Sequence, residues 1–113
     1  MMKMINRASV TIRSGEAVSD PLNLGGLTLA VLDMSALWTA ADLTFAGSGD
    51  NYNWYFIYKE DGTLLQIPTN ESHRIILPSS YLSKHKSIKI CSGTHDVPVY
   101  QGADRIIFLE LWE

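Results

Sequence analysis

The chain has 113 residues, of which 46% are hydrophobic and 19% charged, and its formal net charge is −3. This length and composition suit one domain, residues 1–113, built around a single hydrophobic core. The acidic balance argues against nucleic acid as a partner, and the lack of a long apolar run argues against a membrane span. Because Cys91 is the only cysteine, an internal disulfide and a cysteine-rich metal site are excluded.

Short segments in which polar and apolar residues alternate follow one another along the chain. The strands that this pattern predicts are residues 9–13, 27–33, 42–46, 52–60, 63–67, 73–77, 86–91 and 104–112. Residues 34–41 predict either one helical turn or a loop across an open end of the fold. About eight short strands with polar turns and almost no helix predict an all-β protein, an antiparallel, jelly-roll-like β-sandwich. A closed barrel is the structural alternative.

The last predicted strand, residues 104–112, is the longest and is hydrophobic on both faces. Such a strand is either central in its sheet or an exposed edge that awaits a neighbour. The two-sided hydrophobicity favours the central position. If another subunit covers one of its faces, the protein is a component of an assembly.

The most aromatic stretch is residues 52–60, in which Trp54, Phe56 and Tyr58 share one face of a strand. Core packing is the favoured role for these rings, because aromatic residues are common in buried strands. The alternative is an exposed platform on which sugar rings stack. The candidate binding or interface residues are therefore Trp38, Tyr52, Trp54 and Tyr55.

The histidines His73, His85 and His95 are scattered, without the close pair that a zinc site usually shows. We therefore predict no metal and no cofactor. The acidic turns at Asp50 and Asp61 favour Asx-turn hydrogen bonding, and a calcium site between them stays open as an alternative.

Residues 92–96 contain Ser92, His95 and Asp96, the residue types of a hydrolytic triad. The members of a triad normally converge from separate elements, so a polar turn is the better interpretation of this run. We expect no enzyme activity, and a hydrolase is a distant third hypothesis.

Three segments together resemble a family of small proteins encoded among bacteriophage and prophage structural genes. They are residues 10–15 with 24–26, the Trp-Thr-Ala-Ala-Asp-Leu-Thr-Phe run at 38–45, and residues 92–94 with 98–101 and 103–105. The runs Trp-Thr-Ala-Ala and Gln-x-Ala-Asp-Arg are more specific than a generic strand pattern. No functional residues are carried over from the family.

The resemblance implies a virion component made in the host cytoplasm: a capsid decoration or cement protein, or a part of the neck, tail or fibre. Its expected partners are the major capsid, neck or tail subunits and further copies of itself, in a closed homo-oligomer. The sequence does not separate head from tail. A carbohydrate-binding module for host attachment, with a glycan bound at the aromatic loop, is the alternative function.

Overall fold

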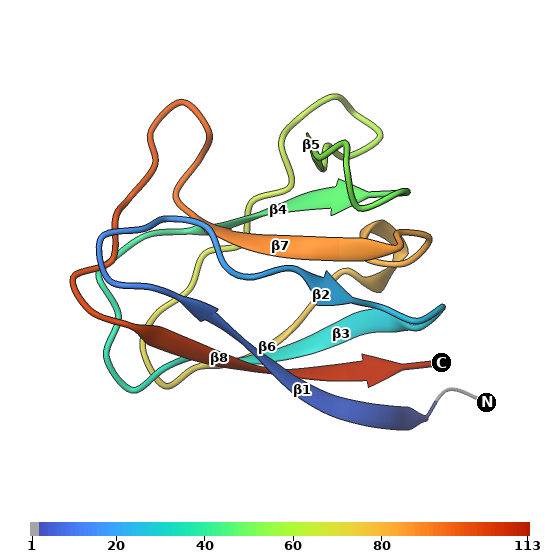
Figure 1. The fold of residues 1–113 in the computed structure, drawn as a ribbon, viewed down its shortest axis with the longest axis horizontal. Helices are drawn as coiled ribbons and strands as arrows, with labels where there is room; N and C mark the ends of the chain where they lie inside the picture. Colours follow the sequence, from blue (N-terminus) through green and yellow to red (C-terminus); the bar gives the residue numbers. More distant parts are fainter. Residues whose placement is uncertain (1–2) are drawn as a thin grey trace.

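The computed structural model describes residues 3–113 as two antiparallel sheets packed face to face (Figure 1). The first sheet has the order β1 (Met4–Ile12), β8 (Arg105–Trp112), β3 (Thr28–Asp33) and β6 (Arg74–Ile76). The second has the order β2 (Leu22–Asn23), β7 (Ser87–Ser92), β4 (Leu43–Ser48) and β5 (Tyr55–Phe56). A short 3-10 helix, η1 (Ser79–Tyr81), precedes β7.

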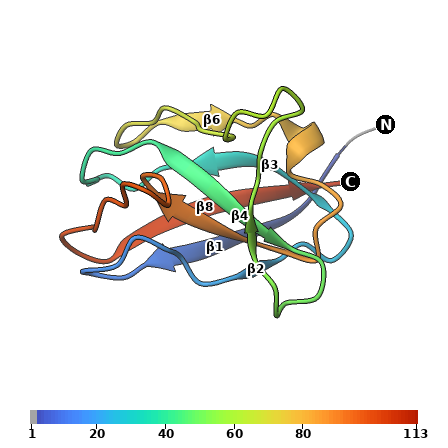
Figure 2. The same cartoon turned by 90° about the horizontal axis from the view of Figure 1, so that it is seen from above.

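This strand order, 1-8-3-6 over 2-7-4-5, is that of a jelly roll, so the predicted β-sandwich is confirmed. The two sheets are separate, which rules out the closed barrel. Seen from above, β4 and β7 cross obliquely over β3 and β8 (Figure 2). This angle arises from the twist of each sheet.

Several predicted elements need correction. Of residues 52–60 only Tyr55–Phe56 form a strand, whereas residues 34–41 form the loop that was one of their two predicted alternatives. Residues 63–67 make single bridges, Tyr58 with Leu64 and Leu43 with Ile67, where a strand was expected. The two-residue strand β2 was not predicted, because two residues are too few for an alternating pattern to show.

The hydrophobic core lies between the sheets, and β1, β4, β7 and β8 supply alternate residues to it. Ile107, Leu109 and Leu111 of β8 are at most 2% exposed. Phe45, Ile88 and Ile90 face them from the second sheet and are fully buried. Because β8 lies between β1 and β3, the central position predicted for it is confirmed.

A buried amide side chain joins the connections at one end of the sandwich. Gln101 is 1% exposed. Its Oε1 accepts hydrogen bonds from the Thr39 backbone N–H at 2.9 Å and from Arg105 Nε at 3.1 Å. Its Nε2 donates to the Ser92 hydroxyl at 2.7 Å and to the Thr39 carbonyl at 3.1 Å. Both donors and both acceptor positions of the amide are therefore used.

The backbone of Gln101 extends this network to the connection that follows β1. Its N–H donates to the Glu16 carbonyl at 2.9 Å, and its carbonyl accepts from the Gly15 N–H at 2.8 Å. Thr39 and Gln101 come from the two most specific runs of the family resemblance, and those runs meet here. Their shared role in this structure is to hold the fold together.

Replacing Gln101 with alanine is expected to lower the free energy of unfolding by about 3 kcal/mol or more. The change leaves the buried Ser92 hydroxyl and the partly buried Thr39 N–H without their partner. Urea denaturation followed by circular dichroism measures the loss. Gln66→Ala is the matched control, because Gln66 is exposed and donates only to Asp42 at the surface. Equal effects of the two substitutions would contradict the role assigned to Gln101.

Candidate binding surfaces

The four predicted site residues do not lie together. Trp38 is 8% exposed and belongs to the core, where its indole N–H donates to the Ala41 carbonyl at 3.1 Å. It therefore offers no surface for a ligand. Tyr52 and Tyr55 are 87% and 72% exposed, and Trp54 between them is partly buried.

The aromatic residues of β5 and its flanks occupy the outer face of the second sheet. Phe56 pairs with Ala46, whose neighbour Phe45 points into the core, so Phe56 points outward. Trp54 and Tyr58, two residues away on either side, share this direction. The expectation that these three rings fill the core is wrong, since the space between the sheets is already filled and Ile57 is the residue that packs inward.

Two side chains from β7 and from the loop that follows it complete this surface. Lys89 Nζ lies 4.4 Å from the centre of the Trp54 ring. The His95 ring lies 4.9 Å from that of Phe56, and its Nε2 is 3.2 Å from the Tyr58 hydroxyl. We call this surface the aromatic face; it consists of Trp54, Phe56, Tyr58, Lys89 and His95.

Sequence reasoning missed Lys89 and His95. The alternation in β7 marks Lys89 as outward-facing, but only the pairing of β7 with β4 places it beside the aromatic residues. His95 is held by a tight loop that starts at Gly93, which has φ +79°. A Cβ at Gly93 would lie 2.5 Å from the Val97 carbonyl oxygen, so the loop requires glycine there.

The Ser92, His95 and Asp96 side chains do not form a triad. Ser92 is buried and its hydroxyl accepts a hydrogen bond from Gln101. His95 contacts Asp96 at 3.2 Å but turns its other ring nitrogen to Tyr58. Although the neighbours His95 and Asp96 do reach each other, the serine lies apart from them.

The Asx-turn interpretation of Asp50 is confirmed. Its carboxylate accepts hydrogen bonds from the backbone N–H groups of Asn53 at 2.8 Å and Tyr52 at 2.9 Å, and from the Asn53 amide. These bonds hold the pKa of Asp50 well below its ordinary value. Asp61 accepts in the same way from Thr63. Residues 3–113 contain no group of three or more His, Cys, Asp or Glu side chains placed to hold a metal ion.

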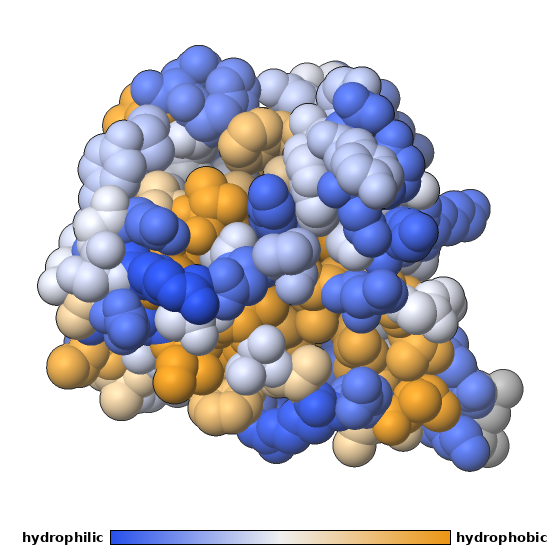
Figure 3. Space-filling model, viewed as in Figure 1, coloured by the Kyte–Doolittle hydropathy of each residue, from blue (hydrophilic) through white to orange (hydrophobic). Residues whose placement is uncertain are grey.

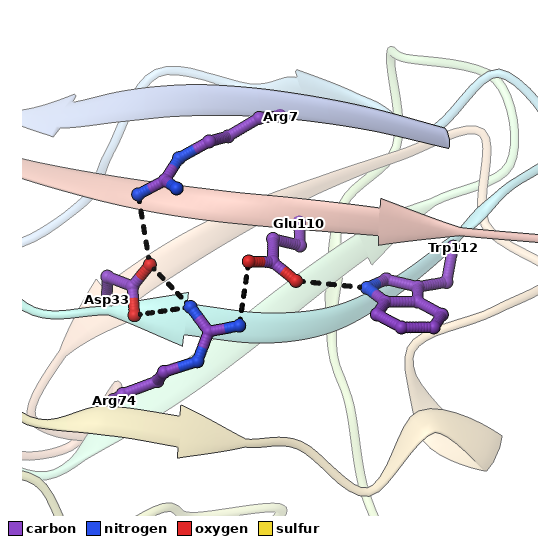
Figure 4. Close-up of polar contacts among 5 residues, drawn as sticks. All are labelled: Arg7, Asp33, Arg74, Glu110 and Trp112. Carbon is purple, nitrogen blue, oxygen red and sulfur yellow. Dashed lines mark hydrogen bonds and ion pairs between the residues drawn. The ribbon is translucent and has the colours of Figure 1, made fainter. Parts of the chain in front are cut away.

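The outer face of the first sheet carries a chain of ion pairs across all four strands (Figure 4). Asp33 accepts from Arg7 at 3.2 Å and from Arg74 at 3.0 Å. Arg74 also donates to Glu110 at 2.7 Å, and Glu110 accepts from the Trp112 indole at 3.2 Å. We call this set the ionic network.

The charges of the ionic network balance within it. Two arginines face two carboxylates, and the hydrogen bond from Arg74 lowers the pKa of the Glu110 carboxyl below its ordinary value. The same bond raises the pKa of Arg74. Glu110 is only 8% exposed, so this pairing compensates for the desolvation of its carboxylate.

Large apolar side chains are exposed on the same face. Ile76 is 73% exposed, Ile106 49% and Phe108 47%, and the Arg7 guanidinium lies 5.6 Å from the centre of the Phe108 ring. Figure 3 views the sandwich from the side of the edge strands β1 and β2, and there too hydrophobic residues reach the surface between hydrophilic ones in the lower part of the molecule. Apolar groups interleaved with satisfied polar groups are typical of protein interfaces.

The described residues also form an open hollow of about 430 Å³ between the connection that follows β1 and the loop that follows β7. It is lined by Gly15, Glu16, Ala17, Val18, Pro98 and Tyr100. Its lining is mostly apolar and includes one carboxylate, that of Glu16. The hollow therefore brings together no set of acid, base and nucleophile.

Comparison with known proteins identifies a solved structure with a similar fold. No family model matches the chain, and no curated protein is similar to it. The crystal structure of the SPBc2 prophage-derived protein YomS is similar, with a TM-score of 0.58 at 11% sequence identity. The match covers 96% of this chain and 94% of that one. At this identity the likeness establishes a common fold.

Among the described residues, no helix has the length and hydropathy needed to cross a membrane.

We expect Trp38→Ala to lower the free energy of unfolding by about 3–5 kcal/mol, because it opens a cavity in the core. Trp54→Ala is the matched control: its ring lies at the surface against Lys89, and we expect a loss of about 1 kcal/mol. Denaturation curves for both variants give the two values. A larger loss for Trp54 than for Trp38 would contradict their placement.

Glu110→Gln tests the ionic network. A carboxyl whose pKa is lower in the folded than in the unfolded chain contributes stability that is complete above its unfolded value of about 4.3 and is lost as the pH falls through the folded value. The variant should therefore be less stable than the wild type at neutral pH and lose less stability between about pH 5 and pH 2.

Urea midpoints measured across this pH range decide the matter, with Glu71→Gln, at an exposed turn, as the control. Some acid sensitivity should persist in every variant, because the pKa values of Asp50 and Asp61 are also lowered in the fold. A Glu110→Gln curve parallel to that of the wild type would show that the pairing with Arg74 contributes nothing.

Proposed function

We propose that the protein is a phage- or prophage-encoded structural component that works through protein–protein contacts, as a capsid decoration or cement protein or as part of the neck or tail. The observation that carries the proposal is the fold shared over nearly its full length with a prophage-derived protein. The resemblance of three segments of the sequence to a family of phage structural proteins supports the same origin.

The surfaces of the sandwich support contact as the mode of action. The ionic network neutralises the charges of the first sheet's outer face, and Ile76, Ile106 and Phe108 stand exposed around it. Such a face binds through area and packing, as protein interfaces do. The proposal assigns no reaction to the protein, and its one thiol, Cys91, is buried with its pKa raised to about 11 by desolvation.

Glycan binding is the second candidate, and the exposure of Tyr52 and Tyr55 favours it. Sugar-binding platforms use the flat face of a ring. The Trp54 ring is partly buried and has Lys89 against it, which leaves the two tyrosines as the available rings. We therefore rank contact with other proteins first.

Particles made by the phage or prophage that carries this gene test the proposal. We expect the protein to co-migrate with purified particles, and deletion of the gene to remove a discrete density from particle images. The substitution Phe108→Ser should release the protein from particles, because Phe108 is an exposed anchor on the first sheet. Tyr52→Ser is the matched control on the other sheet. Absence from particles together with binding on a glycan array would favour the second candidate.

A further inference from the structure

One edge of the first sheet is formed by a long strand that is partly free on its outer side. β1 spans nine residues and pairs with β8 on one side only. Within the part of the chain that the structure describes, the other edge strands are β6 with three residues and β2 and β5 with two each. Edge strands are commonly kept very short, which protects them from pairing with another chain. β1 is too long to be protected in this way.

Backbone groups in the middle of β1 point away from the sheet. The Asp20 N–H donates to the Thr11 carbonyl at 3.2 Å, from the side that β8 does not occupy. In an antiparallel strand every second residue directs its N–H and C=O to the same side, so Ser9 and Arg7 face this edge as well. Nothing within residues 3–113 donates to or accepts from their backbone groups there.

Charged side chains often prevent an edge strand from pairing with another chain, but those in and next to β1 are already bound in ion pairs. β1 contains one charged residue, Arg7, whose side chain is paired with Asp33 on the outer face of the sheet. Arg13, just after the strand, is paired with Asp20 at 2.6 Å. β1 has no proline, and its exposed N-terminal residues Met4 and Ile5 are apolar. The edge is therefore open to another strand and adds no unpaired charge.

We propose that two copies of the chain pair antiparallel through β1, about a two-fold axis at Ala8, and join their first sheets into one continuous sheet. In this register Arg7 lies opposite Ser9 of the second copy, so the free backbone groups of both residues are satisfied across the axis. A register centred on Arg7 would place two arginines opposite each other, which is unfavourable. The Asp20 N–H already takes the Thr11 carbonyl, and Thr11 would lie opposite Ile5 of the second copy, so the ladder is confined to residues 7–9 and the second strand leaves it at the irregularity between Met4 and Asn6.

The second copy fits this edge better than an unrelated strand because the edge is complementary to itself. Ala8 is small, and its two copies meet at the position where paired residues of an antiparallel ladder approach most closely. This inference rests on the geometry of β1 and does not depend on the proposed function: a dimer in solution and attachment to a particle are measured separately.

Sedimentation of the purified full chain gives the first test. We expect a dimer at about 0.1 mM protein, that is, a dissociation constant below this concentration. Ser9→Pro should weaken the dimer at least about tenfold, because proline removes the N–H that faces the edge and blocks the approach of a second strand. It removes no hydrogen bond to β8, so circular dichroism should show the fold unchanged. Ser9→Ala is the matched control and should leave the dimer intact.

Cysteine substitution gives a second test that does not depend on proline. Under mild oxidation Ala8→Cys should form a disulfide-linked dimer, since directly opposed residues at that position lie within disulfide reach. Asn6→Cys should not, because its two copies would lie about 13 Å apart along the strands. The native Cys91 is buried and its raised pKa keeps it out of the exchange.

A monomer at about 0.1 mM overturns the proposal, and so does a dimer that survives Ser9→Pro with its fold intact. If Ser9→Pro does not fold, the cysteine pair decides: cross-linking at Ala8 and not at Asn6 supports the register, and the reverse refutes it.

Discussion

The Gln101 side chain is the constraint on which one end of the sandwich depends. It links Thr39 in the connection between β3 and β4 to Ser92 at the end of β7 and to Arg105 at the start of β8. Because Ser92 and Gln101 flank residues 93–100, their hydrogen bond closes the base of that loop, and the loop carries His95 to its position against Phe56. The amide has no spare donor or acceptor, so loss of any partner leaves a buried polar group unpaired. The histidine of the aromatic face is thus positioned by a polar contact in the interior.

The two sheets share one core but present different surfaces to a partner. On the second sheet, Trp54 and Phe56 lie against Lys89 and His95, and the rings are partly covered by their own neighbours. On the first, Arg74 joins Asp33 to Glu110, and exposed apolar side chains such as Phe108 lie among these charges. A partner of the first sheet would therefore bury apolar area and need supply no counter-charge, because the arginines and carboxylates on this face neutralise one another.

Alternation of residues predicts which segments become strands, but not which side of each strand faces the core. For β8 the segment and its central position in the sheet were predicted correctly, because Ile107 and Leu109 belong to a long run that is apolar on both faces, but no side of it was assigned to the core. For Trp54 and Phe56 the alternation along the chain was predicted correctly, but the side of the strand that faces the core was predicted wrongly. A strand of two residues takes its orientation from its neighbour β4, and the local sequence does not show that pairing. The ionic network was missed for the same reason. Asp33, Arg74 and Glu110 each look like ordinary outward residues, and only the order β8-β3-β6 brings them together.

Arg7 connects the face of the first sheet to its free edge. Its guanidinium reaches across β8 to Asp33 and lies over Phe108, while its backbone faces away from β8. A strand that paired with β1 would fix the backbone of Arg7 and reduce the conformational freedom that its half-exposed side chain retains in a monomer. The ion pair with Asp33 would then cost less entropy to form. Pairing of β1 with a second strand and ordering of the Arg7–Asp33 ion pair therefore favour each other. An assembly that contacted both the edge and the outer face of the first sheet would gain more free energy than the sum of two separate contacts.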